Sequence, residues 1–179
     1  RAYNKLLTPL LYQLFSRNPF LKLGSTNYKP LQSICAMDEF RVSLLPANIH
    51  KHRNRARTTE EAVFDIIANT QNYALVDLVN SATTPSGRLL RYPVLCPDRR
   101  TRDHLSRLLS SYGLGTSVMY DVPLIEIPMV DSLVSTRGTS NCAKSFADRL
   151  ITFPVHEGVS DYHLELLRAL LTSPVRSNL

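Results

Sequence analysis

The sequence predicts an α/β (α+β) domain in which a small antiparallel or mixed sheet is covered by helices and preceded by a long helical connector. Apolar residues recur at helical spacing through residues 31–67, whereas the C-terminal half alternates short apolar runs with helical patterns. The length of 179 residues and the hydrophobic fraction of 44% are enough for one ordinary core. We therefore expect a helical arm and loop over 1–30, the connector over 31–80, and a C-terminal small α/β domain over 81–179.

The N-terminal segments are predicted to be helices separated by prolines and loops. The apolar stretch Leu6–Phe15 predicts a helical arm. This stretch is far shorter than the roughly 20 residues that a membrane span needs, so we expect no membrane segment. Residues 31–45 have helical spacing, Pro46 is expected to kink or interrupt that helix, and a second helix is expected to run from there through Ile67.

Strands and helices are expected to alternate after residue 81. Pro93 should restrict the first strand to a sheet edge or a bulge, because proline has no N–H to donate. Asp98 is predicted to cap the next helix, which Gly113 closes, and Ser160 to cap the last helix. The expected elements are strands over 89–96, 114–119 and 150–153, helices over 98–113, 141–150 and 160–171, and a proline-marked loop over 120–128.

A net charge of +6 and one basic cluster raise the question of an anionic partner. The cluster consists of His50, Lys51, His52, Arg53, Arg55 and Arg57. At helical spacing Arg53 and Arg57 share one face, the histidines point elsewhere, and no aromatic residue is interleaved for stacking on bases. A solvated helix face is therefore favoured over a phosphate or nucleic-acid patch, and we expect no nucleic-acid partner.

Cysteine and histidine usage indicates a reducing compartment and no metal. Cys35, Cys96 and Cys142 are widely spaced with no Cys-x-x-Cys pair, which predicts free thiols and a cytoplasmic protein. Cys142 stands at a predicted helix start and is interpreted as a buried small apolar residue rather than a nucleophile. The five histidines form no His-Glu-x-x-His motif, so no metal site is expected.

Three short patches occur in a fixed order along the chain. Asn27-Tyr28-Lys29 precedes the long helix and is similar to an Asn-Tyr-Arg loop. Arg91–Val94, followed after one helix by residues 118–128, is similar to a His-Tyr-Pro-x-Pro-Leu-His-x-x-Pro element. Residues 143–161 contain a helix, a strand ending in proline and a Ser-Asp helix start. Over about residues 24–171 the chain thus resembles the C-terminal (small-domain) part of the DegT/DnrJ/EryC1/StrS family of pyridoxal-phosphate-dependent sugar aminotransferases.

The resemblance implies the small domain of a fold-type I aminotransferase, whose large domain holds pyridoxal phosphate on a lysine. In that family the lysine lies upstream of the Asn-Tyr-Arg loop, and Lys5 and Lys22 have no family-like context. We therefore expect no catalytic residue in this chain, no cofactor bound to the chain alone, and pyridoxal phosphate in a parent protein. The start at Arg1 is what a domain taken from a longer protein would show.

The resemblance also implies site residues and partners by position. Asn27 would reach across a homodimer interface toward a cofactor phosphate, and Lys29 would supply the charge that arginine gives in the family. Tyr120 keeps the family identity and would contact substrate, the alternative being that it packs under the proline loop. The parent would transfer an amino group to a keto-sugar nucleotide in surface polysaccharide or antibiotic sugar synthesis, and the fragment alone would be inactive.

The second patch departs from the family pattern at its two histidine positions. Met119 and Ile125 stand where the family has histidines, and neither side chain can donate a hydrogen bond or exchange a proton. These departures leave a second interpretation open, a non-catalytic interaction or assembly domain that reuses the aminotransferase fold.

Overall fold

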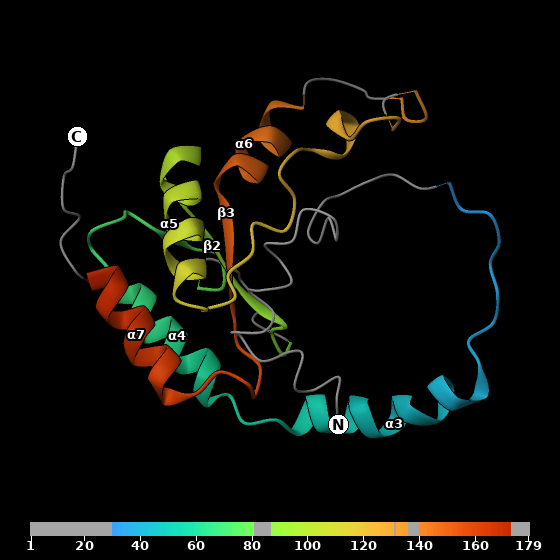
Figure 1. The fold of residues 1–179 in the computed structure, drawn as a ribbon, viewed down its shortest axis with the longest axis horizontal. Coiled ribbons are helices and arrows are strands. Elements are labelled where there is room, and N and C mark those ends of the chain that lie inside the picture. The colour runs from blue at the N-terminus through green and yellow to red at the C-terminus, as the bar shows by residue number, and fades with distance from the viewer. Residues whose placement is uncertain (1–29, 81–86, 131, 136–139, 173–179) are drawn as a thin grey trace.

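The computed structural model describes residues 30–80, 87–130, 132–135 and 140–172 (Figure 1). The predicted α/β class is confirmed, with a small antiparallel sheet among helices. The arm expected over Leu6–Phe15 lies outside the described residues. In chain order the elements are α3 (Glu39–Asn54), α4 (Thr58–Ala68), β1 (Val76–Asp77), β2 (Arg91–Leu95), α5 (Arg99–Ser111), the short 3-10 helix η1 (Leu124–Glu126), α6 (Asn141–Arg149), β3 (Leu150–Pro154) and α7 (Asp161–Thr172).

The sheet has the order β1-β2-β3, and both pairings are antiparallel. Helix α4 packs along α7, while α5 packs against β3 and α6 (Figure 1). One core joins α4, the sheet, α5 and α7, so the second half of the expected connector shares its apolar interior with the C-terminal domain. Its fully buried members include Val63, Ile66, Val94, Leu105, Ile151, Phe153 and Leu171.

β2 is the central strand although Pro93 lies in its middle, which differs from the expected edge position or bulge. The register gives the reason. β1 pairs only with Leu95 and Val94 and ends there, so Pro93 lies beyond β1 and has only β3 beside it. Because proline is tolerated where one neighbouring strand is missing, β2 loses no ladder bond on that side.

The prediction of a strand over residues 114–119 is wrong. Only Ser117 pairs with the sheet, through an isolated bridge in which it and Thr152 exchange backbone hydrogen bonds of 3.1 Å and 2.8 Å. Gly113 and Gly115 both have positive φ, 78° and 62°, which bends the backbone away from an extended path just before this bridge. The segment therefore touches the edge of β3 at one point and turns away.

The caps of α5 form as expected. The Asp98 carboxylate accepts from the Thr101 N–H at 2.7 Å. At the other end the N–H of Gly113 donates to the Ser110 carbonyl and that of Leu114 to the Leu109 carbonyl, both at 3.0 Å. These two bonds around a left-handed glycine make a Schellman motif, which satisfies carbonyls that a helix end otherwise leaves unpaired.

Ser160 stands directly before α7 as expected, but its side chain bonds another side chain and not a backbone N–H. The Ser160 hydroxyl is paired with Nδ1 of His163 at 2.7 Å, and the Ser160 N–H donates to the same nitrogen at 3.1 Å. The imidazole of His163, three residues on, thus reaches back to the Ser160 N–H, which is one half of a capping box with histidine in place of Glu or Gln.

Helix α3 differs from the two helices expected around Pro46. It is one helix that begins after the Asp38 cap, whose carboxylate accepts from the Arg41 N–H at 2.9 Å, and continues through Pro46. Residues 31–37 are not helical, and the break falls at residues 55–57 instead. Proline removes one internal hydrogen bond, but α3 has no buried residue, so water can solvate the freed carbonyl.

The apolar side chains of α3 point to two opposite sides. Val42, Leu45 and Ile49 share one face, and Phe40 and Leu44 share another, the two faces lying about 150° apart at roughly 100° per residue. All five are between 42% and 72% exposed. In Figure 1 the helix projects from the body formed by the sheet and the other helices. The described helices include none that is both long and apolar enough to cross a membrane.

The different exposure of the three cysteines gives a direct test of this fold. Cys96 is fully buried, and burial raises the pKa of its thiol to about 12, whereas Cys35 and Cys142 are exposed. The prediction that Cys142 is buried is therefore wrong, because α6 buries only Ala147. Since the thiolate is the reactive form, Ellman's reagent should modify two thiols on mixing and the third only on unfolding. Three fast thiols in the native chain would contradict the placement of β2.

Candidate functional site

The candidate site is the loop of residues 118–128, here called the Tyr120 loop, which carries the proline-marked motif. It leaves the sheet after Ser117 and makes a three-residue turn in which the Tyr120 N–H donates to the Val118 carbonyl at 2.7 Å. The central residue of that turn, Met119, has φ of 61°, and its own N–H donates to the Ser117 hydroxyl at 3.1 Å. A tight turn with positive φ at a residue other than glycine stores backbone strain, which accumulates at functional sites.

The turn leaves Tyr120 on the surface. Its side chain is 57% exposed, and the neighbouring Met119 and Leu124 are exposed as well. The alternative that Tyr120 packs under the loop is therefore wrong. An exposed phenol on a loop that also exposes two apolar side chains offers one hydrogen-bonding group for an organic ligand.

The rest of the loop is held to the body. Ile127 is buried, as is Val130 just after the loop. The 3-10 helix η1 is joined to α6 because the Lys144 ammonium bonds both carboxylate oxygens of Glu126, at 2.9 Å and 3.0 Å. Asp121, directly after Tyr120, lies 3.8 Å from a guanidinium nitrogen of the buried Arg102. The loop thus presents its tip from a base fixed at several points.

Arg102 and Arg91 organise the surroundings of this loop. Arg102 donates to the Ala147 carbonyl at 2.6 Å, and Arg91 donates to the Gly115 carbonyl at 2.6 Å and to the Thr152 hydroxyl at 2.7 Å. Sequence reasoning gave neither a role. For Arg102 a signal exists, because it follows the spacing of Leu105 and Leu109 on the buried face of α5.

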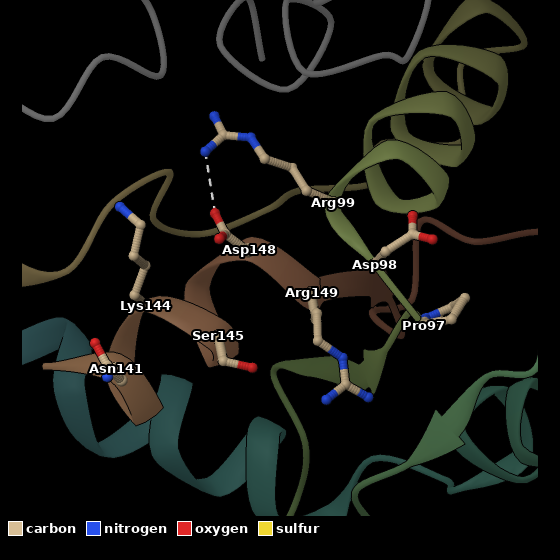
Figure 2. A pocket seen from close by; sticks show the side chains of 8 residues that line it. All are labelled: Pro97, Asp98, Arg99, Asn141, Lys144, Ser145, Asp148 and Arg149. Atoms are coloured by element: carbon tan, nitrogen blue, oxygen red, sulfur yellow. Dashed lines mark hydrogen bonds and ion pairs between the residues drawn. The ribbon is translucent and has the colours of Figure 1, made fainter.

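A separate depression of about 420 Å³ lies between the start of α5 and α6 (Figure 2). Its lining residues are Pro97, Asp98, Arg99, Asn141, Lys144, Ser145, Asp148 and Arg149. The cations there are already engaged: Arg99 with Asp148 at 3.0 Å, Lys144 with Glu126, and Arg149 with the Cys96 carbonyl at 2.7 Å. The charged side chains that line the depression therefore stabilise the contact between α5 and α6.

The basic cluster around α3 is used in a similar way. Arg55 is mostly buried, pairs with Glu60 at 2.7 Å, and donates to the Leu89 carbonyl at 2.9 Å. Lys51 pairs with Glu157 at 2.7 Å, and this ammonium holds the pKa of the carboxyl below its usual range. The prediction of a solvated helix face therefore does not hold for every residue of the cluster. Two of its cations, Lys51 and Arg55, join α3 to the body.

The described residues do not fit pyridoxal phosphate by themselves. A Schiff base needs an available lysine, and the two described lysines, Lys51 and Lys144, are both ion-paired with carboxylates. Asn27 and Lys29, the residues expected at the cofactor phosphate, lie outside the described residues. Within the described ranges, no three His, Cys, Asp or Glu side chains gather as a metal site would require.

Comparison with known proteins gives a family and a fold. The sequence model of the DegT/DnrJ/EryC1/StrS aminotransferase family matches residues 26–170. DesV from S. venezuelae, solved with a ketimine intermediate, is similar with a TM-score of 0.61 and 17% identity, over 90% of this chain and 43% of DesV. Spr1654 from Streptococcus pneumoniae, described as a sugar aminotransferase and solved in its PLP form, has a TM-score of 0.59 and 18% identity, over 77% of this chain and 36% of that one. No curated protein matches in sequence.

At these identities the likeness to the two structures shows the fold alone. The chain spans less than half the length of either. The Tyr120 loop and the three elements of the sheet lie within the residues that the family matches.

The strain at Met119 can be measured. Met119→Gly should raise the free energy of unfolding by up to about 1 kcal/mol, because glycine removes the roughly 1–2 kcal/mol cost of a left-handed residue while gaining unfolded-state entropy. Met129→Gly, at φ of 71°, should behave alike. Leu124→Gly, within η1, should destabilise by about 0.5–1 kcal/mol. Urea unfolding measures the free energy of unfolding of all three variants. A decrease for Met119→Gly equal to that for Leu124→Gly would contradict backbone strain at Met119.

Proposed function

Since this chain belongs to the DegT/DnrJ/EryC1/StrS aminotransferase family, we propose that it is the small domain of a pyridoxal-phosphate-dependent enzyme that transfers an amino group to a keto-sugar nucleotide. The observation that carries the proposal is the family match over residues 26–170, which covers all the elements from α3 to the body of α7. The similar fold of DesV and of the Streptococcus pneumoniae protein supports it.

The proposed division of labour follows from the residues present. Bound pyridoxal phosphate supplies the electron sink that amino transfer needs. In the proposal it is held elsewhere in the parent, since both described lysines are ion-paired. This chain would contribute Tyr120 to the substrate side of the cleft, and Asn27 and Lys29 to the cofactor phosphate of a dimer partner.

The two apolar faces of α3 support the idea that the chain works within a larger protein. A helix that is apolar on opposite sides is stable when both sides are covered, and here neither face is buried. In the proposal, surfaces of the large domain cover them. The division into an arm over 1–30, a connector over 31–80 and a small domain over 81–179 belongs to the same proposal.

Partners, pathway and location complete the proposal. The parent would act as a cytoplasmic homodimer on a nucleotide-sugar substrate in surface polysaccharide synthesis, and this fragment alone would be inactive. The reducing compartment agrees with three free thiols.

A non-catalytic interaction or assembly domain is the second candidate. Met119 and Ile125 favour it, because an active parent would need another source for the hydrogen bonds of the two missing histidines. In that case the parent would assemble with its partner but hold no pyridoxal phosphate.

The complete parent protein, reconstituted with pyridoxal phosphate, distinguishes the two candidates. We expect the absorbance of an internal aldimine and its loss when the upstream lysine is replaced. A parent protein that never binds the cofactor would contradict the proposal that it is an enzyme.

Tyr120→Phe in the same protein tests the substrate contact. Loss of one hydrogen bond of about 1 kcal/mol should lower kcat/KM roughly 3- to 10-fold. Tyr162→Phe is the matched control, because this tyrosine is 71% exposed on α7 and lies outside the loop. An equal change in kcat/KM for the two substitutions would contradict a substrate contact by Tyr120 and would leave the family assignment unaffected.

A further inference from the structure

Arg102 lies where α5, α6 and the Tyr120 loop meet. Its side chain is 1% exposed. Nη1 donates to the Ala147 carbonyl in α6 at 2.6 Å, and Nε and Nη2 donate to the Asp103 carboxylate at 2.9 Å and 2.6 Å. Nη2 carries a second hydrogen, and the Asp121 carboxylate lies 3.8 Å from that nitrogen. One buried guanidinium thus contacts both helices and the loop.

The charge of Arg102 is balanced without Asp121. A buried guanidinium needs a carboxylate partner, and Asp103 already supplies one at hydrogen-bond distance. Asp121 is 65% exposed and would be solvated wherever the loop placed it. The attraction between Asp121 and Arg102 therefore serves the position of the loop more than the stability of the core.

The turn beside Asp121 needs such an anchor. A strained backbone conformation persists only where the surrounding structure holds it in place. Upstream, the bridge between Ser117 and Thr152 fixes the backbone before Met119. Downstream, Asp121 follows Tyr120 directly, and its carboxylate lies 3.8 Å from Nη2 of Arg102.

We propose that Arg102, acting through Asp121, is a positioning residue that holds the strained Met119 turn and so fixes the direction in which Tyr120 leaves the surface. The inference rests on the proposed role of Tyr120 for its functional meaning, but its physical content belongs to the chain alone.

The test uses the 179-residue chain and amide hydrogen exchange read residue by residue by NMR. Asp121→Asn removes the charge, Asp121→Glu keeps it, and Asp103→Asn is the matched control on the other side of the same guanidinium. Exchange rates are corrected for the intrinsic rate of each sequence, and thermal unfolding is recorded for every variant. Substitution of Arg102 itself is avoided because it would leave buried acceptors unpaired.

Asp121→Asn should speed exchange of the Tyr120 amide about 2- to 5-fold, the range of a partly exposed ion pair, with little change in thermal unfolding. Asp121→Glu should restore the slower exchange. Asp103→Asn should lower the unfolding temperature and leave the Tyr120 amide unchanged, because a local opening does not follow global stability.

Unchanged exchange in Asp121→Asn, or equal effects of Asp103→Asn and Asp121→Asn at Tyr120, would overturn the proposal. Neither result depends on cofactor or turnover. A parent protein without aminotransferase activity would therefore contradict the proposed function and would not contradict this inference.

Discussion

Helix α3 imposes the constraint on which the rest of the account depends, because its apolar side chains occupy two opposite faces and none of them is buried. Covering five such side chains on one helix requires two separate surfaces. Its C-terminal end is nevertheless fixed to the body by the pairs of Arg55 with Glu60 and Lys51 with Glu157. The helix is thus anchored ionically at its C-terminal end and presents exposed apolar side chains along its length. This geometry suits insertion between surfaces that the described residues do not provide. The chain spans less than half of the structures it resembles.

The body has a different character, because it is closed around its own core. Buried side chains from α4, the sheet, α5 and α7 pack together, and the cations of the α5–α6 depression are engaged by Asp148, Glu126 and the Cys96 carbonyl. Against this closed body the Tyr120 loop is the feature that turns outward, with a strained residue at its tip and fixed contacts at its base. A rigid base with an exposed tip is the arrangement expected for a binding loop.

Sequence reasoning predicted the elements whose signals are local and missed those set by tertiary context. Asp98, Gly113 and Ser160 act through neighbours within a few residues, so the ends they mark were predicted. Strand β1 has only two residues and no pattern of its own, and Pro93 is accommodated only because β1 ends one residue before reaching it. The length of α3 across Pro46 depends on solvent rather than on pattern. At the candidate site the motif located Tyr120, whereas the importance of Arg102 appears only once three separate segments meet, and Asn27 and Lys29 remain predictions.

Amide hydrogen exchange of α3, compared between this chain and the complete parent protein, tests the central claim most directly. In the chain alone, the α3 amides should exchange much faster than those of α5, because no side chain of α3 is buried. In the parent they should slow by at least about tenfold as both apolar faces become covered. Protection of α3 equal to that of α5 in the chain alone, or no slowing in the parent, would contradict the claim that this helix is built to lie between surfaces of a larger protein.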